Sequence, residues 1–146
     1  MYADGGAHYE VVVGRTGSAS FEAGSAAAAG VRSELQAAGA LGSGFPQVVV
    51  EILRVDERSI GVRAAGVQPL ARGSEITVVG RALVLPSANA NSTLDTGDVS
   101  RSSQFASGPT PAADAEARSR AVRDAARSLG RALGRAVLGL PEPAEG

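Results

Sequence analysis

The segment Gln47-Val-Val-Val-Glu-Ile-Leu-Arg-Val55 is the most strongly β-forming stretch of the chain. β-Branched and other apolar residues dominate it, and in its first half they stand at consecutive positions. A strand that is apolar on both faces is typical of the interior of a sheet, so we expect this strand to be central. Residues 56–62 extend it, either as one long bent strand or as a strand followed by a turn.

Three further segments predict strands beside this one. Tyr9–Val13 is short and β-branched, residues 74–85 alternate in polarity, and Asp98–Phe105 is a weaker, serine-rich candidate for an exposed edge. A short connection joins the segments 47–62 and 74–85. This arrangement predicts that the two pair antiparallel.

Two segments predict helices. Ser25–Ala38 carries small apolar residues at steps of three and four, and residues 112–138 form a longer amphipathic pattern. Asp114 and Glu116 lie in the first turns of the longer helix, where the helix dipole favours acids. Gly30, inside the shorter helix, indicates either a close approach to the sheet or a tolerated weakness of about 1 kcal/mol relative to alanine.

The element order is strand, helix, strand, strand, strand, helix. It predicts an α+β two-layer sandwich, in which a mainly antiparallel sheet of three or four strands carries both helices on one face. The 146 residues fit one domain, which we expect over residues 8–140, with disordered segments at 1–7 and 141–146. No stretch approaches the roughly 18 consecutive apolar residues of a membrane-spanning helix.

The composition narrows the function. The chain has no Cys and no Lys, its only histidine is His8, and all 14 of its basic residues are Arg. These absences exclude thiol nucleophiles, cysteine metal sites, Schiff-base lysines and a phosphate-binding P-loop. His8 and Glu10 are too few to hold a metal ion. We therefore expect a protein that is not an enzyme and that binds no cofactor and no metal.

One triplet, Asp95-Thr96-Gly97, has a catalytic interpretation. Aspartic proteases present a carboxylate in such a triplet, and two paired aspartates share one proton. The residues before the triplet are polar, whereas a protease needs a buried strand there, and Asp-x-Gly is ordinary turn chemistry. A turn is the favoured interpretation, and a hydrolase built on Asp95 is an alternative.

Arginines supply the candidate binding surfaces. Five of them form a stripe along one face of the last predicted helix: Arg120, Arg123, Arg127, Arg131 and Arg135. The stripe is typical of a solvated helix face. A nucleic-acid-binding domain is the alternative, although no aromatic residue accompanies the stripe for base stacking.

A second group of arginines could make a cationic rim at one end of the sheet. Arg63 and Arg72 flank the connection between the two longest predicted strands, and Arg101 lies on the serine-rich strand. Solubility alone also explains such a group.

The element order resembles that of the lipopolysaccharide-assembly lipoproteins, the small subunit of the outer-membrane translocon for lipopolysaccharide. The resemblance covers residues 9–140. It lies in the helix ending Val31-Arg-Ser-Glu-Leu-Gln-Ala-Ala-Gly39, the strands Val48–Val55 and Ile76–Leu85, and the final amphipathic helix. It implies a non-enzymatic subunit that docks into an outer-membrane β-barrel protein and assists lipopolysaccharide transport.

The resemblance also implies a ligand and a location. Lipid A phosphates would be bound by basic residues, for which Arg63, Arg72 and Arg101 are the candidates by charge and placement. The location would be the periplasmic side of the outer membrane. That family is anchored through a lipidated N-terminal Cys, which this sequence lacks, so we expect a leader and an anchor cysteine upstream of Tyr2. Other periplasmic lipoprotein adaptors, including activators of cell-wall synthases, are an alternative, and no nucleic-acid partner is expected.

Overall fold

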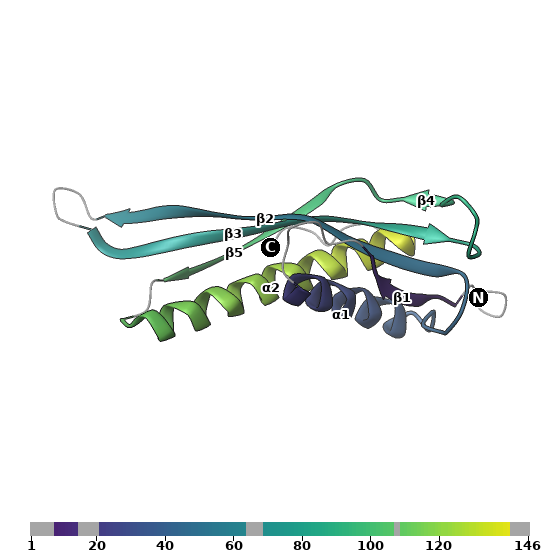
Figure 1. Cartoon of the computed structure of the whole chain (residues 1–146), viewed down its shortest axis with the longest axis horizontal. Helices are drawn as coiled ribbons and strands as arrows, with labels where there is room; N and C mark the ends of the chain where they lie inside the picture. Colours follow the sequence, from purple (N-terminus) through teal and green to yellow (C-terminus); the bar gives the residue numbers. More distant parts are fainter. Residues whose placement is uncertain (1–7, 15–20, 64–68, 107–108, 141–146) are drawn as a thin grey trace.

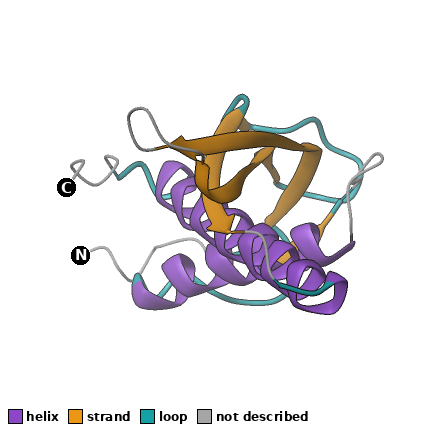
Figure 2. Cartoon of the chain, turned by 90° about the vertical axis from the view of Figure 1, so that its left-hand side faces the viewer, coloured by secondary structure: helices purple, strands orange, loops and turns teal. Residues whose placement is uncertain are grey.

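The structure, a computed structural model, describes residues 8–14, 21–63, 69–106 and 109–140. These residues form a five-stranded mixed sheet with two helices packed on one face, in the order β-α-β-β-β-β-α (Figures 1 and 2). The predicted α+β sandwich is confirmed, but the sheet has more strands than the three or four expected. The segments 1–7 and 141–146, for which disorder is predicted, lie outside the described residues.

Two long strands form the centre of the sheet. β2 (Gln47–Arg63) and β3 (Pro69–Leu85) have 17 residues each and pair antiparallel along their length. Of the two alternatives for residues 47–62, one long strand is therefore correct. A bulge lies between Ile52 and Arg54, and it lets Ile52 and Val55 both contact the core although three residues separate them.

Short strands complete the two edges. β1 (Glu10–Val13) pairs parallel with β2, so β2 is central as predicted. On the other side, both β4 (Leu94–Asp95) and β5 (Val99–Ala106) pair antiparallel with β3. The sequence analysis expected no strand at β4, because two residues are too short to show a periodicity of two.

The helices begin close to where the sequence places them. α1 (Phe21–Ala37) starts four residues before the predicted helix, and α2 (Pro111–Val137) matches its prediction to one residue at each end. The hydroxyl of Thr110 accepts a hydrogen bond of 3.1 Å from the backbone N–H of Ala113, which caps the start of α2. Among the described residues, no helix is long and apolar enough to cross a membrane.

The two helices run parallel to each other. Glu22 near the start of α1 pairs with Arg123 of α2 at 2.8 Å, and Glu34 near its end pairs with Arg135 at 3.7 Å. The two ion pairs are 12 residues apart on both helices. They therefore fix the direction and the register of α1 on the second half of α2, as Figure 1 shows.

Between these ion pairs the backbones of the two helices touch. A Cβ atom added to Gly130 would overlap the carbonyl oxygen of Ala27, and one added to Gly30 would overlap that of Arg127. Gly30 thus serves a close approach, as one of its two interpretations holds. The approach is to α2, however, and not to the sheet.

The core lies between the sheet and this pair of helices. Its largest fully buried side chains come from both helices and from β2 and β3: Val31, Leu35, Val48, Val50, Ile52, Ile76, Val78, Leu129 and Leu133. No buried polar or charged residue occurs in the part of the chain that the structure describes. Alanines fill the remaining space, so that the helices lie close to each other and to the sheet.

The far half of the β2–β3 hairpin extends past α1 and has only the first half of α2 beneath it (Figure 1). Arg118 of α2 joins the two by donating to the carboxylate of Glu57 on β2 at 2.9 and 3.2 Å. Its guanidinium also lies 5.5 Å from the centre of the Phe105 ring on β5. The hydrogen bond from Arg118 lowers the pKa of Glu57 from its ordinary value of 4.5.

We expect Gly130→Ala to destabilise the protein, although alanine favours an isolated helix by about 1 kcal/mol over glycine. The new Cβ meets the backbone of α1, and overpacking of this kind costs about 1–3 kcal/mol. Urea unfolding followed by circular dichroism measures the loss. Ala136→Val, at an exposed site of α2, is the control and should change stability by less than about 0.7 kcal/mol. Equal stability of Gly130→Ala and wild type would contradict the contact.

The Glu57–Arg118 pair predicts a pH dependence. Because the folded-state pKa of Glu57 is lowered, its ionised form stabilises the fold above the unfolded value, and this contribution is lost as pH falls through the lowered pKa. Glu57→Gln should cost less than about 1 kcal/mol at pH 7, since both partners are partly exposed. The cost should vanish in unfolding curves recorded well below the lowered pKa. A difference that persists unchanged in acid would show that the pair is not its source.

Candidate functional site

The backbone register separates the three arginines for which the sequence predicts a common rim. Arg63 pairs with Pro69 and Arg72 with Gly61, so both lie at the far end of the β2–β3 hairpin. Arg101 lies opposite Val78, six residues further along β3 than Arg72, which is about 20 Å at the rise of a strand. The structure therefore brings Arg63 and Arg72 near one another and places Arg101 elsewhere.

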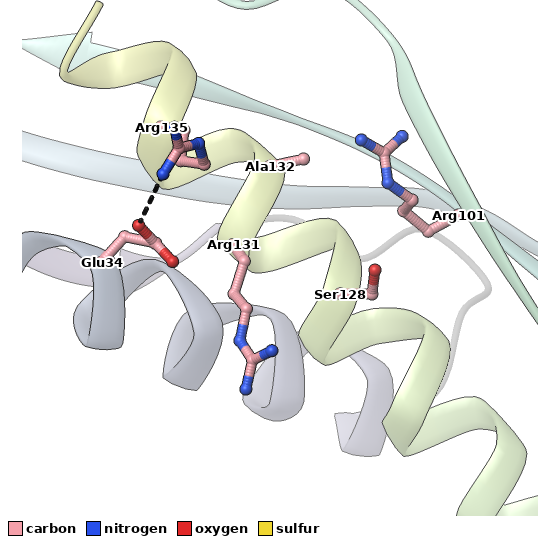
Figure 3. A pocket seen from close by; sticks show the side chains of 6 residues that line it. All are labelled: Glu34, Arg101, Ser128, Arg131, Ala132 and Arg135. Atoms are coloured by element: carbon pink, nitrogen blue, oxygen red, sulfur yellow. Dashed lines mark ion pairs between the residues drawn. The ribbon is translucent and has the colours of Figure 1, made fainter. Parts of the chain in front are cut away.

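Arg101 lines a surface pocket of about 290 Å³ between β5 and the two helices (Figure 3). It lies on the face of β5 that also carries the half-buried Val99 and Phe105, as the alternation of the sequence predicts. The complete lining is Glu34 of α1, Arg101 of β5, and Ser128, Arg131, Ala132 and Arg135 of α2. The pocket thus combines one predicted site residue with two arginines of the predicted helix stripe.

Two arginines lie on different sides of Ala132 in this pocket (Figure 3). The guanidinium of Arg135 reaches towards Glu34, 3.7 Å away, and the two side chains are only 27% and 23% exposed. Arg101 extends from β5 and donates through Nη1 to the backbone carbonyl of Ser100 at 2.8 Å. Packing and these contacts hold both guanidinium groups in place.

The other lining residues give the pocket its floor and rim. Ala132 is 7% exposed, and its small side chain leaves room above the helix. Ser128 is exposed one turn earlier and offers a hydroxyl. Arg131 is exposed as well, and in Figure 3 its guanidinium is turned away from Arg101.

The rest of the arginine stripe is largely occupied by ion pairs. Arg120 binds Glu116 at 3.6 Å, and Arg123 binds Glu22 at 2.8 Å. Hydrogen bonds from Ser119 and Arg123 lower the pKa of the Glu22 carboxyl group. These arginines fasten α2 to α1 or to itself, which disfavours a continuous surface for a nucleic-acid backbone.

The triplet Asp95-Thr96-Gly97 forms a turn. The Asp95 carboxylate accepts from the N–H of Gly97 at 2.8 Å, and Gly97 has a φ of 76°. Thr96 Oγ1 accepts from the N–H of Ala82 at 3.0 Å and donates to the carbonyl of Gly97 at 2.9 Å. Asp95 is exposed, so its carboxylate serves the turn at the surface and lacks the buried strand setting of a protease.

The possible metal ligands near the N-terminus do not converge. Glu10 accepts a hydrogen bond from the N–H of Gly44 at 2.7 Å, and His8 is exposed. Within residues 8–14, 21–63, 69–106 and 109–140, no three acidic, histidine or cysteine side chains are grouped closely enough for a metal ion.

Sequence reasoning missed the pocket as a unit. The spacing of Ser128, Arg131, Ala132 and Arg135 places these residues on neighbouring positions of a helix surface, and this signal was available. The approach of Arg101 and Glu34 was not, because it depends on the packing of β5 and α1 against α2.

We expect Thr96→Val to destabilise the turn between β4 and β5. The substitution keeps the shape of the side chain but removes the acceptor of the Ala82 N–H, and an unsatisfied backbone group costs about 1–3 kcal/mol. Thr93→Val is the matched control, because its hydroxyl makes only a long contact of 3.5 Å with Val84. Thermal unfolding should rank Thr96→Val below the control, and the reverse order would remove this role of Thr96.

Comparisons with known proteins bear on the fold. No protein-family model matches the chain, and neither does any curated protein. A candidate lipoprotein from Caulobacter crescentus is 21% identical over 93% of each chain, with a TM-score of 0.52. A minor lipoprotein from Acinetobacter baumannii is 9% identical over 88% of this chain and 94% of its own, with a TM-score of 0.52. A hypothetical protein from Chlamydia trachomatis is 12% identical over 92% and 96%, with a TM-score of 0.53. In fold, this chain is therefore similar to bacterial lipoproteins over nearly its whole length.

Proposed function

We propose that this protein is a non-enzymatic binding and assembly subunit of the bacterial envelope. It docks into an outer-membrane β-barrel protein from the periplasmic side and assists the transport of lipopolysaccharide to the cell surface. In its native form it is lipid-anchored.

One observation carries this proposal: the fold is shared with two bacterial lipoproteins from end to end. The alignments cover 93% and 88% of this chain and 93% and 94% of those proteins, so they include the sheet and both helices. The order of elements, which resembles that of the lipopolysaccharide-assembly lipoproteins, supports the more specific role.

The shape of the sheet also suits docking. β2 and β3 project past α1 as a hairpin, and Arg63 and Arg72 lie at its far end. A projecting hairpin enters a concave partner without disturbing the core, and arginines recognise phosphate groups through paired N–H donors. Arg63, Arg72 and Arg101 are the residues that we propose to contact lipid A phosphates.

The alternatives differ in support. A periplasmic adaptor for another partner, such as a cell-wall synthase, would use the same fold and is separated from the proposal only by its ligand and partner. A nucleic-acid-binding domain is less well supported, because Arg120, Arg123 and Arg135 of the stripe pair with carboxylates.

Arg63→Glu combined with Arg72→Glu should weaken binding of the purified protein to immobilised lipopolysaccharide at least about tenfold, since each charge contact with a phosphate is lost and replaced by repulsion. The matched control is Arg54→Glu with Arg120→Glu, which changes the net charge equally at two exposed positions. Circular dichroism checks that both variants are folded. Equal binding of the two double variants would sink the role of the hairpin arginines.

Depletion and partner capture test the wider role. In the source bacterium, depletion should reduce lipopolysaccharide at the cell surface, and the tagged chain should co-purify with an outer-membrane β-barrel protein that is required for that transport. Normal surface lipopolysaccharide after depletion would argue for the adaptor alternative. Salt-sensitive binding to DNA that is lost in Arg127→Glu with Arg131→Glu would instead favour the nucleic-acid alternative.

A further inference from the structure

We propose that the pocket between α1, α2 and β5 is a binding site for a phosphomonoester group, with Arg101 and Arg135 as its principal ligands. The site is distinct from the far end of the hairpin, where the proposed function places Arg63 and Arg72. It shares only Arg101 with that proposal and holds whether or not lipopolysaccharide is the cargo of the protein.

The charge of the lining matches such a group. Three arginines stand against one glutamate, so the six lining residues carry a formal charge of +2. A phosphomonoester carries a charge of about −1.5 to −2 at pH 7. A carboxylate would compensate only half of the charge that the pocket presents.

The geometry of the donors suits the shape of the phosphate. A guanidinium offers five N–H donors in a planar fork that fits two oxygens of a phosphate at once. Arg101 and Arg135 approach from different elements on different sides of Ala132, so together they can grip different oxygens of a tetrahedral group (Figure 3). The exposed Arg131 can swing inwards from the rim, and the Ser128 hydroxyl adds a donor.

The remaining features limit what the phosphate is attached to. None of the six lining residues is aromatic, so the pocket has no surface on which a nucleotide base could stack. A volume of about 290 Å³ is at the small end for ligand pockets, which run from about 300 to 1,000 Å³. A phosphate on a small polar group such as a sugar fits, with Glu34 to accept a hydroxyl proton.

Isothermal titration at low ionic strength tests the site with inorganic phosphate and glucose 1-phosphate as probes. We expect saturable binding at pH 8 and weaker binding at pH 5, because a phosphomonoester loses its second negative charge below about pH 6. Arg101→Gln should weaken binding at least about tenfold, as expected for loss of a charged hydrogen-bond donor. Arg120→Gln, which changes an exposed arginine of the same helix, should have less than a twofold effect.

Ser128 supplies a test that does not depend on the ion pairs. Ser128 is exposed, so both Ser128→Glu and Ser128→Gln should fold. The glutamate places a negative charge at the rim and should abolish binding, whereas the glutamine of similar size should retain most of it. Absence of saturable binding in the wild type, or equal effects of Arg101→Gln and Arg120→Gln, would overturn the proposal.

Vesicles distinguish the source of the phosphate. Phosphatidylcholine vesicles containing phosphatidic acid present a phosphomonoester, whereas those containing phosphatidylglycerol present a diester. Binding to the first kind alone, abolished by Ser128→Glu, would identify a lipid headgroup as the ligand. Binding of free glucose 1-phosphate without vesicle binding would identify a free sugar phosphate. Both results support the pocket, and neither depends on the lipopolysaccharide measurements with Arg63 and Arg72.

Discussion

The backbone contact between Gly30 and Gly130 determines how the rest of the molecule is arranged. Since neither position has room for a side chain, α1 lies directly against α2, and the ion pairs Glu22–Arg123 and Glu34–Arg135 fix its register. That register brings the end of α1 to the second half of α2, where β5 also packs. The arginine pocket exists only where these three elements meet, so a change in the helix contact would reach the candidate site without altering any of its residues.

The sequence predicts the fold well where burial produces a long pattern. β2, β3 and α2 are recognisable because core residues such as Val48, Ile76 and Leu129 recur with the period of their element. β4 is too short to have a period, and its two residues join the sheet only because β3 offers a free edge beside them. The parallel packing of the helices is equally invisible, because a glycine such as Gly30 indicates a close approach without naming its partner.

The candidate site is predictable only in part for a related reason. All 14 basic residues are arginine, so charge alone cannot separate a structural arginine from a binding one. In the structure, Arg118 and Arg123 mainly join elements to one another, while Arg101 and Arg135 come together beside a small residue, Ala132. The pattern along the chain identifies the arginines on one helix face. Only the packing of a strand and a second helix shows which of them share a cavity.

The uneven lengths of the two layers have a consequence for sequence variation. A strand of 17 residues spans about 55 Å, and the α1 helix of equal length spans about 25 Å, so much of the β2–β3 hairpin has no second helix beneath it. Exposed positions such as Asp56 and Ser59 carry no packing duty there beyond keeping the ladder. Selection for a new partner can therefore rewrite that arm freely, while the alanines and glycines of the paired helices must stay small.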